Sequence, residues 1–460
     1  MKTIIQTLFF LFPILVYPQQ NSDINPPLAW QWVNVGNPGF SPNTAYSVDL
    51  AFGPSGEPYI VYSDTQNDWK ATVMRFDGTD WVLVGNAGFS ADLVDQINIK
   101  FDPSGVPYVA YDDSGNDDKC TVMKFDGMDW VNVGNPGFSS SNVWYTSLAI
   151  SPTGVPYVAY QENGGSSKAS VMRFNGTAWE YVGSPGFTNG MAFYTRLAFN
   201  PADSLPYIAY GDGYVGRKAT VRKFDGTMWV PVGDTCFSLG FSSWTVLAFS
   251  PAGVPFVAYA EQLIDGKATV MRLDTTGWVN VGYYGFTAGI VTYLELAFNS
   301  TGELFLSFTD WGYVRKASVM KFTGTDWEYV GIPGFSAGES LSNAFAFGPG
   351  DVPYVAYQDW GNNGNATVMK YDFPTGINDN PYGKVTLCPN PASGYLTLGL
   401  VGFRTMKKTI EIINSQGKTE SLFNTADREV TMNIENLPSG LYIVKVSTER
   451  SVHISRFIRL

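Results

Sequence analysis

The sequence is poor in the residues that most catalytic and metal sites require. It has one histidine, His453, and three cysteines, Cys120, Cys236 and Cys388, among 460 residues. A Ser-His-Asp triad needs an imidazole as its base, so it is excluded everywhere before His453. The cysteines follow no regular spacing, which predicts neither a disulfide framework nor a zinc site. The net charge of −12 lacks the basic excess that nucleic acid binding requires.

Long apolar runs are also scarce. The one marked run extends from Ile4 to Val16, directly after Met1-Lys2. It is shorter than the roughly 18 to 20 residues that cross a bilayer, and no later run approaches that length. A short apolar segment behind a basic residue is typical of a secretory signal peptide. We therefore expect residues 1–19 to be a cleaved leader, and no transmembrane span.

What the sequence does contain is a repeat. Tryptophan recurs at intervals of 49, 49, 49, 50, 49 and 49 residues, at Trp32, Trp81, Trp130, Trp179, Trp229, Trp278 and Trp327. Each is followed by a Val-Gly pair and then a Phe, as in Val35-Gly36 and Phe40. A period near 50 with short strands is typical of a propeller blade of four strands. The tryptophans are expected to be buried between blades.

Alternation and turn residues place the strands within each period. In the first repeat they predict strands at 47–52, 58–62 and 71–76, and Asp77-Gly78 predicts a hairpin into a fourth strand at Trp81. The first of the seven Trp strands, around Trp32, precedes the first complete unit. We expect it to complete the last blade and close the ring. The prediction is an all-β fold, with a seven-bladed β-propeller over residues 28–373.

A carboxylate ends the second strand of every repeat, and a lysine follows it six residues later in six of them. This pattern favours an ion pair across the hairpin or, alternatively, a ring of polar ligand pockets. Aromatic residues occupy the same loops and lead into the first strands, among them Tyr145, Phe193, Tyr194 and Tyr293. Flat rings beside carboxylates suit sugars. The candidate ligand-binding residues are Asp64, Trp69, Asp113, Trp144, Asp212, Tyr214, Trp244, Asp310, Trp311, Asp359 and Trp360.

One position in the first strand differs from repeat to repeat, as an active site on a repeated scaffold requires. Its residues are Asp49, Asn98, Ser147, Arg196, Val246, Glu295 and Ala344. If they face the channel, Asp49, Arg196 and Glu295 are candidates for acid–base catalysis or for clamping an anion, and the carboxylates could serve glycoside hydrolysis. The acidic segment from Asp112 to Asp118 is a candidate calcium loop or a solvated hairpin. No other cofactor or metal is expected.

The repeat stops after Asp372. Residues 374–383 are expected to form a linker, and residues 384–460 alternate apolar and polar positions as a small β-sandwich does. Four segments, at Pro389-Asn390-Pro391, 412–417, 437–442 and 456–459, resemble the type A C-terminal sorting domain of the type IX secretion system of Bacteroidetes. The repeat body more loosely resembles seven-bladed propeller proteins. The sorting-domain resemblance implies passage to the periplasm, export by the type IX machinery, removal of the domain, and release or surface attachment.

Three functional hypotheses remain open. The leading one is a secreted or surface-displayed binding or adhesion protein, acting as a monomer, that presents a propeller face to a glycan or a protein. The alternative is a secreted carbohydrate-active hydrolase or lyase with its site at the channel mouth. The sequence leaves open whether the protein is an enzyme, and it favours the non-enzymatic hypothesis because no catalytic constellation repeats or converges visibly. A purely structural surface element is a third possibility.

Overall fold

The computed structural model describes residues 30–372, 384–401, 407–414, 417–448 and 452–460. The expected leader, 1–19, and linker, 374–383, lie outside these residues. The chain divides into two units, and all the repeats fall in the one that comprises Trp30–Asp372. None of the helices in the described residues has the length and apolar character that a bilayer crossing requires.

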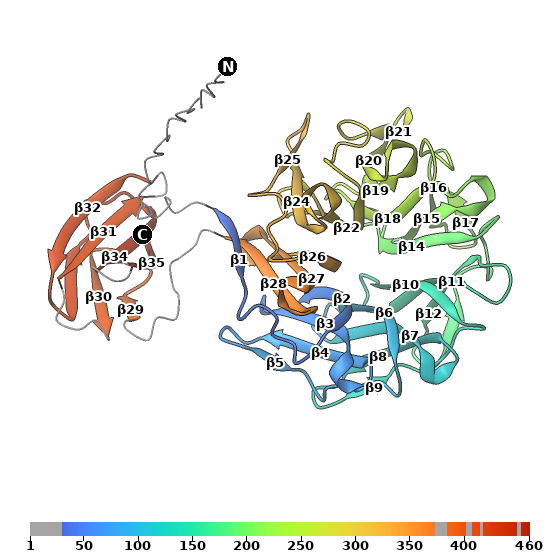
Figure 1. The fold of residues 1–460 in the computed structure, drawn as a ribbon, viewed down its shortest axis with the longest axis horizontal. Helices are drawn as coiled ribbons and strands as arrows, with labels where there is room; N and C mark the ends of the chain where they lie inside the picture. Colours follow the sequence, from blue (N-terminus) through green and yellow to red (C-terminus); the bar gives the residue numbers. More distant parts are fainter. Residues whose placement is uncertain (1–29, 373–383, 402–406, 415–416, 449–451) are drawn as a thin grey trace, which may run out of the picture. The chain divides into compact units, whose positions relative to one another are not determined.

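The unit that contains the repeats is a ring of seven four-stranded antiparallel sheets (Figure 1). This confirms the predicted propeller. One strand of each sheet lies nearest the centre of the ring: β2 (Ala45–Phe52), β6 (Val94–Phe101), β10 (Val143–Ile150), β14 (Ala192–Phe199), β18 (Ser242–Phe249), β22 (Val291–Phe298) and β26 (Ser340–Gly348).

The remaining strands follow outward in chain order. The second strands are β3 (Pro58–Asp64), β7 (Pro107–Asp113), β11 (Pro156–Glu162), β15 (Pro206–Asp212), β19 (Pro255–Glu261), β23 (Leu304–Asp310) and β27 (Val352–Asp359). The third are β4 (Lys70–Phe76), β8 (Lys119–Phe125), β12 (Ala169–Phe174), β16 (Lys218–Phe224), β20 (Lys267–Asp274), β24 (Lys316–Phe322) and β28 (Asn365–Asp372). The outermost are β5 (Trp81–Leu83), β9 (Trp130–Asn132), β13 (Trp179–Tyr181), β17 (Trp229–Pro231), β21 (Gly277–Asn280), β25 (Trp327–Tyr329) and β1 (Gln31–Asn34).

The last blade is completed by the first strand of the chain, as predicted. β1 pairs with β28 in antiparallel register, with Trp32 opposite Tyr371. The first and last blades also share a hydrophobic cluster, in which Val48 and Leu50 of β2 meet Ala344 of β26 and Ala356 of β27. The ring is therefore closed both by a strand pair and by a packed core.

The repeated tryptophans join neighbouring blades. Each indole N–H donates to the carbonyl of the Val in the preceding blade's Val-Gly pair, at 2.7 to 3.0 Å in all seven cases. Each ring also stacks on that blade's Phe, with centroids 4.1 to 4.8 Å apart. The glycine leaves room for the ring, because a Cβ on Gly36 would lie 3.1 Å from Cδ1 of Trp81. The residues that recur in the sequence, Trp, Val-Gly and Phe, are thus the ones that form the contacts between blades.

Short 3-10 turns connect the second and third strands of six blades. They are η1 (Thr65–Asn67), η2 (Ser114–Asn116), η3 (Gly213–Val215), η4 (Gln262–Ile264), η5 (Trp311–Tyr313) and η7 (Trp360–Asn362); a further turn, η6 (Pro349–Asp351), joins β26 to β27. Each of the six begins after the carboxylate that ends the second strand. Since β2 pairs with β3 so that Ala45 faces Asp64, these turns lie at the end of the sheet where the inner strand begins.

The C-terminal unit is a small β-sandwich, as predicted. One sheet contains β29 (Lys384–Cys388), β30 (Tyr395–Val401) and β33 (Glu429–Asn433). The other contains β32 (Thr419–Thr425), β31 (Lys408–Asn414), β34 (Gly440–Ser447) and β35 (Val452–Arg459). Both sheets contribute to one core, in which Leu396 and Leu398 of β30 pack with Ile410, Val444 and Phe457 of the other sheet. This unit therefore has its own hydrophobic core.

Candidate functional site

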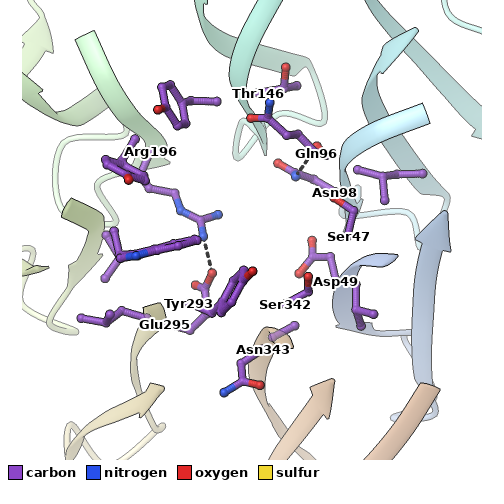
Figure 2. Close-up of a pocket in the computed structure, with 18 of the residues that line it drawn as sticks. Ser47, Asp49, Gln96, Asn98, Thr146, Arg196, Tyr293, Glu295, Ser342 and Asn343 are labelled. Carbon is purple, nitrogen blue, oxygen red and sulfur yellow. Dashed lines mark hydrogen bonds and ion pairs between the residues drawn. The ribbon is translucent and has the colours of Figure 1, made fainter. Parts of the chain in front are cut away.

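A pocket of about 450 Å³ opens at the centre of the propeller and is lined by the inner strands of all seven blades. Its walls are the first halves of these strands, for example Tyr46 to Asp49 of β2 and Tyr293 to Glu295 of β22 (Figure 2). The pocket therefore lies at the same end of the ring as the 3-10 turns. A concave site at a channel mouth, lined by both aromatic and polar side chains, is a common place for a ligand.

A β-bulge near the start of every inner strand shapes this pocket. In each, the pairing with the second strand shifts, as between Tyr46 and Asp49. One residue of each bulge has a left-handed backbone, with φ between 48° and 56°, although none is glycine: Ser47, Gln96, Tyr145, Tyr194, Trp244, Tyr293 and Ser342. Non-glycine residues adopt this conformation at a cost, and such strain gathers at functional sites. The bulges place these residues on the pocket wall.

The residues at the bulges divide the wall into an aromatic and a polar half. In four consecutive blades they are Tyr145, Tyr194, Trp244 and Tyr293, which we call the aromatic arc. Their rings follow one another with centroids 4.8, 5.4 and 4.4 Å apart. In the other three blades the position is polar, at Ser342, Ser47 and Gln96. An apolar face thus stands across the pocket from groups that donate and accept hydrogen bonds.

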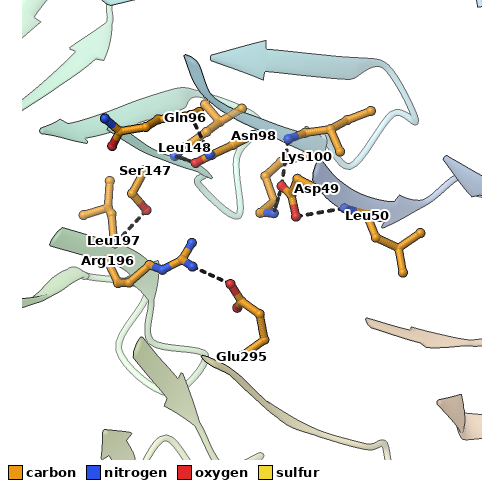
Figure 3. A network of polar contacts seen from close by, with 11 residues as sticks. Asp49, Leu50, Gln96, Asn98, Lys100, Ser147, Leu148, Arg196, Leu197 and Glu295 are labelled. Carbon is orange, nitrogen blue, oxygen red and sulfur yellow. Dashed lines mark hydrogen bonds and ion pairs between the residues drawn. The ribbon is translucent and has the colours of Figure 1, made fainter. Parts of the chain in front are cut away.

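Two of the three catalytic candidates meet in the pocket. Arg196 of β14 and Glu295 of β22 form an ion pair that passes over the intervening blade, where the equivalent residue is Val246 (Figures 2 and 3). Burial raises the pKa of Glu295 above its usual value, and the Arg196 guanidinium opposes this shift. The pair therefore holds a carboxyl group of increased proton affinity at the channel mouth.

The third candidate, Asp49, is engaged with the neighbouring blade. Its carboxylate accepts from the N–H of Ile99 at 2.9 Å and from Nζ of Lys100 at 3.0 Å, and also from its own neighbour Leu50. The equivalent side chains of the next two blades do the same: Asn98 accepts from Leu148 N–H at 3.0 Å and Ser147 from Leu197 N–H at 3.1 Å (Figure 3). In these three blades the variable position joins one inner strand to the next.

The candidate carboxylates at the ends of the second strands are buried in their own hairpins. Asp64 accepts from Gln66 N–H, Asn67 Nδ2 and Thr72 Oγ1, at 2.8 to 3.0 Å, and is 1% exposed. It is the N-cap of η1. The other candidates are N-caps of their turns and are likewise buried: Asp113, Asp212, Asp310 and Asp359. Their oxygen atoms bond to the turn, away from the pocket lining.

The predicted ion pair across these hairpins is wrong, although the register was right. Asp64 faces Lys70 and Asp113 faces Lys119. Within residues 30–372, however, none of these acids forms an ion pair with the lysine opposite. Lys119 instead pairs with the exposed Asp117 at 3.7 Å. The N–H groups of the turn bind the carboxylate and stabilise it in the protein interior. The lysine ammonium group stays in contact with water, because the free-energy cost of removing it from water would exceed the gain from an ion pair.

The candidate aromatics separate into two places. Trp244 lines the pocket as part of the aromatic arc. The others lie outside the pocket lining and are between 39% and 72% exposed: Trp69, Trp144, Tyr214, Trp311 and Trp360. Tyr145, Tyr194 and Tyr293 line the pocket with Trp244, although the sequence pattern does not place them among the predicted ligand-binding residues. Their shared repeat position with Trp244 was the signal that could have found them.

The candidate calcium loop does not gather its carboxylates. Asp112 is buried and accepts from Thr146 and Gln96, Asp113 caps η2, and Asp118 accepts from Ser114 Oγ at 2.6 Å. In the described parts of the chain, aspartate, glutamate, histidine and cysteine side chains nowhere form a group of three or more that could hold a metal ion.

Comparison with known families identifies the C-terminal unit. Residues 386–459 match the family of secretion system C-terminal sorting domains, over nearly the whole sandwich. This unit is a C-terminal sorting domain. The domain directs export and surface attachment by the type IX secretion system, and its presence makes the secretion machinery a partner of this chain. No curated protein matches the chain.

Solved structures with a similar arrangement of strands are distant in sequence. One is the extracellular domain of a protein assigned as a hybrid two-component system, from B. thetaiotaomicron, with 11% identity, a TM-score of 0.50 and coverage of 94% of this chain. PorZ, a surface component of the type IX secretion system of Porphyromonas gingivalis, has 14% identity, a TM-score of 0.46 and 91% coverage. This chain spans 59% and 60% of those two. A polysaccharide lyase, an ulvan lyase, has 11% identity and a TM-score of 0.45, covering 74% of this chain and 95% of its own. These likenesses concern the fold alone.

Proposed function

We propose that this exported propeller binds a neutral saccharide in its central pocket, with a sugar ring against the aromatic arc. The observation that supports this is the arc itself, three tyrosines and a tryptophan in contact along one wall. The C–H faces of a pyranose pack well on aromatic rings, while its hydroxyl groups need donors and acceptors on the other side. Ser342, Ser47 and Gln96 supply these on the polar wall.

The charges of the pocket favour a neutral ligand over an acidic one. Three carboxylates line it, Asp49, Asp95 and Glu295, and the guanidinium of Arg196 is its one cationic lining group among the described residues. That guanidinium is paired with Glu295, and the nearby Lys100 is paired with Asp49. An anionic glycan would have to break these pairs and approach the remaining negative charge.

The ion pair of Arg196 and Glu295 is also compatible with an alternative function, glycoside hydrolysis. A carboxyl group with a raised pKa is suited to donate a proton to a glycosidic oxygen. A second carboxylate would be needed as base or nucleophile, and Asp49 is the candidate. Its carboxylate is already engaged by the N–H groups of Leu50 and Ile99 and by the ion pair with Lys100, and it would have to leave these partners to act as base or nucleophile. Binding without turnover is therefore the better supported function.

A binding experiment with the purified full chain tests the proposal. We expect a glycan array to identify neutral ligands, and Trp244→Ala to weaken binding of the best one about tenfold or more, because a buried tryptophan contact dominates such sites. Trp144→Ala is the matched control, since this tryptophan is exposed outside the pocket lining. Its affinity should equal that of the unmodified protein.

Two results would contradict the proposal. Loss of binding in Trp144→Ala but not in Trp244→Ala would move the ligand to the outer aromatics. Release of reducing ends from the bound glycan, abolished by Glu295→Gln, would establish the hydrolase in place of the binding protein.

A further inference from the structure

Asn343 of β26 is a buried amide whose polar atoms have no partner. Asn343 is one of the residues that line the central pocket, beside Ser342, but its amide points away from the pocket centre (Figure 2), and the residue is 5% exposed. Neither Oδ1 nor Nδ2 makes a hydrogen bond in the described structure. Leaving buried polar atoms without hydrogen-bond partners destabilises the folded state. Such a group in a folded protein therefore calls for an explanation.

The other six blades show that the fold does not require an amide here. At the equivalent position three blades have buried apolar residues, Val48, Ile97 and Leu294. The other three have threonines whose hydroxyls are paired: Thr146 with Asp112, Thr195 with the carbonyl of Tyr145, and Thr245 with Ser242. A leucine would fill the position in blade 7 as it does in blade 6, so packing alone does not explain Asn343.

We propose that Asn343 determines the specificity of the pocket by binding two adjacent hydroxyl groups of the ligand. This rests on the proposed saccharide-binding function. A primary amide presents a donor and an acceptor on one edge, so one hydroxyl of a vicinal diol donates to Oδ1 and its neighbour accepts from Nδ2. The amide makes no hydrogen bond in its present rotamer. Rotating the side chain toward the pocket would therefore break no hydrogen bond.

The position of Asn343 fits this role. It follows Ser342, the left-handed residue of the seventh bulge, and so belongs to the polar wall that faces the aromatic arc. A sugar ring stacked on the arc would turn its hydroxyl edge to this wall. The ligand class is thus a neutral sugar with an unsubstituted vicinal diol.

Two variants at the junction of blades 6 and 7 test the assignment. Asn343→Leu installs the residue of blade 6, and we expect it to raise the melting temperature and to lower sugar affinity by about tenfold, since two neutral hydrogen bonds are lost. Ser307→Ala is the control. Ser307 is also buried and unpaired but does not line the pocket, and Ala occupies its position in five of the other blades, at Ala110, Ala159, Ala209, Ala258 and Ala356. It should raise the melting temperature without changing affinity.

The probes are D-glucose, D-mannose and D-galactose, titrated into the full chain, followed by the 2-, 3- and 4-deoxy analogues of the best ligand. We expect two analogues that lack neighbouring hydroxyl groups to bind the unmodified protein more weakly than the parent sugar does, because each loses one of the two hydrogen bonds to Asn343. Equal affinity of Asn343→Leu and the unmodified protein for the parent sugar would overturn the assignment and leave the saccharide pocket intact. A melting temperature lowered by Asn343→Leu with unchanged affinity would show that the amide binds structural water, which also overturns it. If none of the three sugars binds the unmodified protein in the millimolar range, both proposals fail.

Discussion

Trp32 and Val330 lie 298 positions apart in the chain, yet the indole N–H of Trp32 donates to the carbonyl oxygen of Val330 at 2.8 Å. The same bond joins every other pair of neighbouring blades, always from a Trp to a Val of the preceding Val-Gly pair. The ring is thus closed by the device that holds it together elsewhere. Only the order in the sequence differs: Trp32 precedes its partner Val330, whereas every other Trp follows its partner Val by 46 or 47 residues.

Replacing Trp32 should therefore destabilise the whole propeller. Trp32→Ala removes the bond to Val330 and the stacking on Phe335, and we expect it to lower the free energy of unfolding by about 3 to 5 kcal/mol. Thermal unfolding of the full chain measures this. Met128→Ala, on a turn and 78% exposed, should leave the melting temperature unchanged. An unaltered melting temperature in Trp32→Ala would show that the contacts of Trp32 with Val330 and Phe335 do not stabilise the closed ring.

The acid at the end of each second strand should matter more than the lysine opposite. Asp64→Ala leaves a turn N–H, an amide and a buried hydroxyl without their acceptor, so we expect a loss of about 2 kcal/mol. Lys70→Ala removes an ammonium group that forms no ion pair with Asp64, and its effect should stay below about 0.5 kcal/mol. If chemical denaturation showed equal losses of unfolding free energy for Asp64→Ala and Lys70→Ala, an ion pair would again explain why an acid and a lysine recur in the repeats.

The sequence was sufficient to predict the ring of blades and its closure, but not the local geometry of the turns and bulges. The strand around Trp32 precedes the first complete repeat, and this position predicted ring closure, because an isolated strand needs a sheet to pair with. The interactions of Asp64 were harder to predict. Its register opposite Lys70 follows from the length of the hairpin. Its capping of η1 depends on the direction of the N–H groups in a three-residue turn, which the sequence does not specify. The aromatic arc depends on a bulge, which shifts side chains by one position and so alters which residues face the channel. Alternation alone does not reveal that shift.

Calcium should have no effect on stability. The oxygen atoms of Asp112, Asp113 and Asp118 are each turned to separate hydrogen-bond donors, so binding an ion would require breaking these bonds first. We expect the same melting temperature with 1–2 mM calcium and with excess EDTA. A rise on adding calcium that is lost in Asp118→Asn would instead establish this loop as a calcium site.

Asp112 should make the propeller more stable in mild acid than at neutral pH. Burial raises the pKa of this carboxyl well above 3.8, and the nearby Asp95 and Asp118 act in the same direction, while its bond from Thr146 opposes them. In the unfolded chain the group ionises at its usual pKa. The folded state therefore binds the extra proton between that pH and its own raised pKa, and stability falls as pH rises through this interval.

Asp112→Asn cannot titrate, so this contribution to the slope should disappear. We expect the variant to gain stability relative to the unmodified protein as the pH increases from 4 to 7, measured by urea unfolding at each pH. Asp225→Asn is the control of opposite sign. Backbone N–H groups of Thr227 and Met228 lower the pKa of Asp225, so its carboxylate stabilises the fold above its usual pKa and loses that effect in acid. If both variants changed in the same direction with pH, burial of Asp112 would not be the cause.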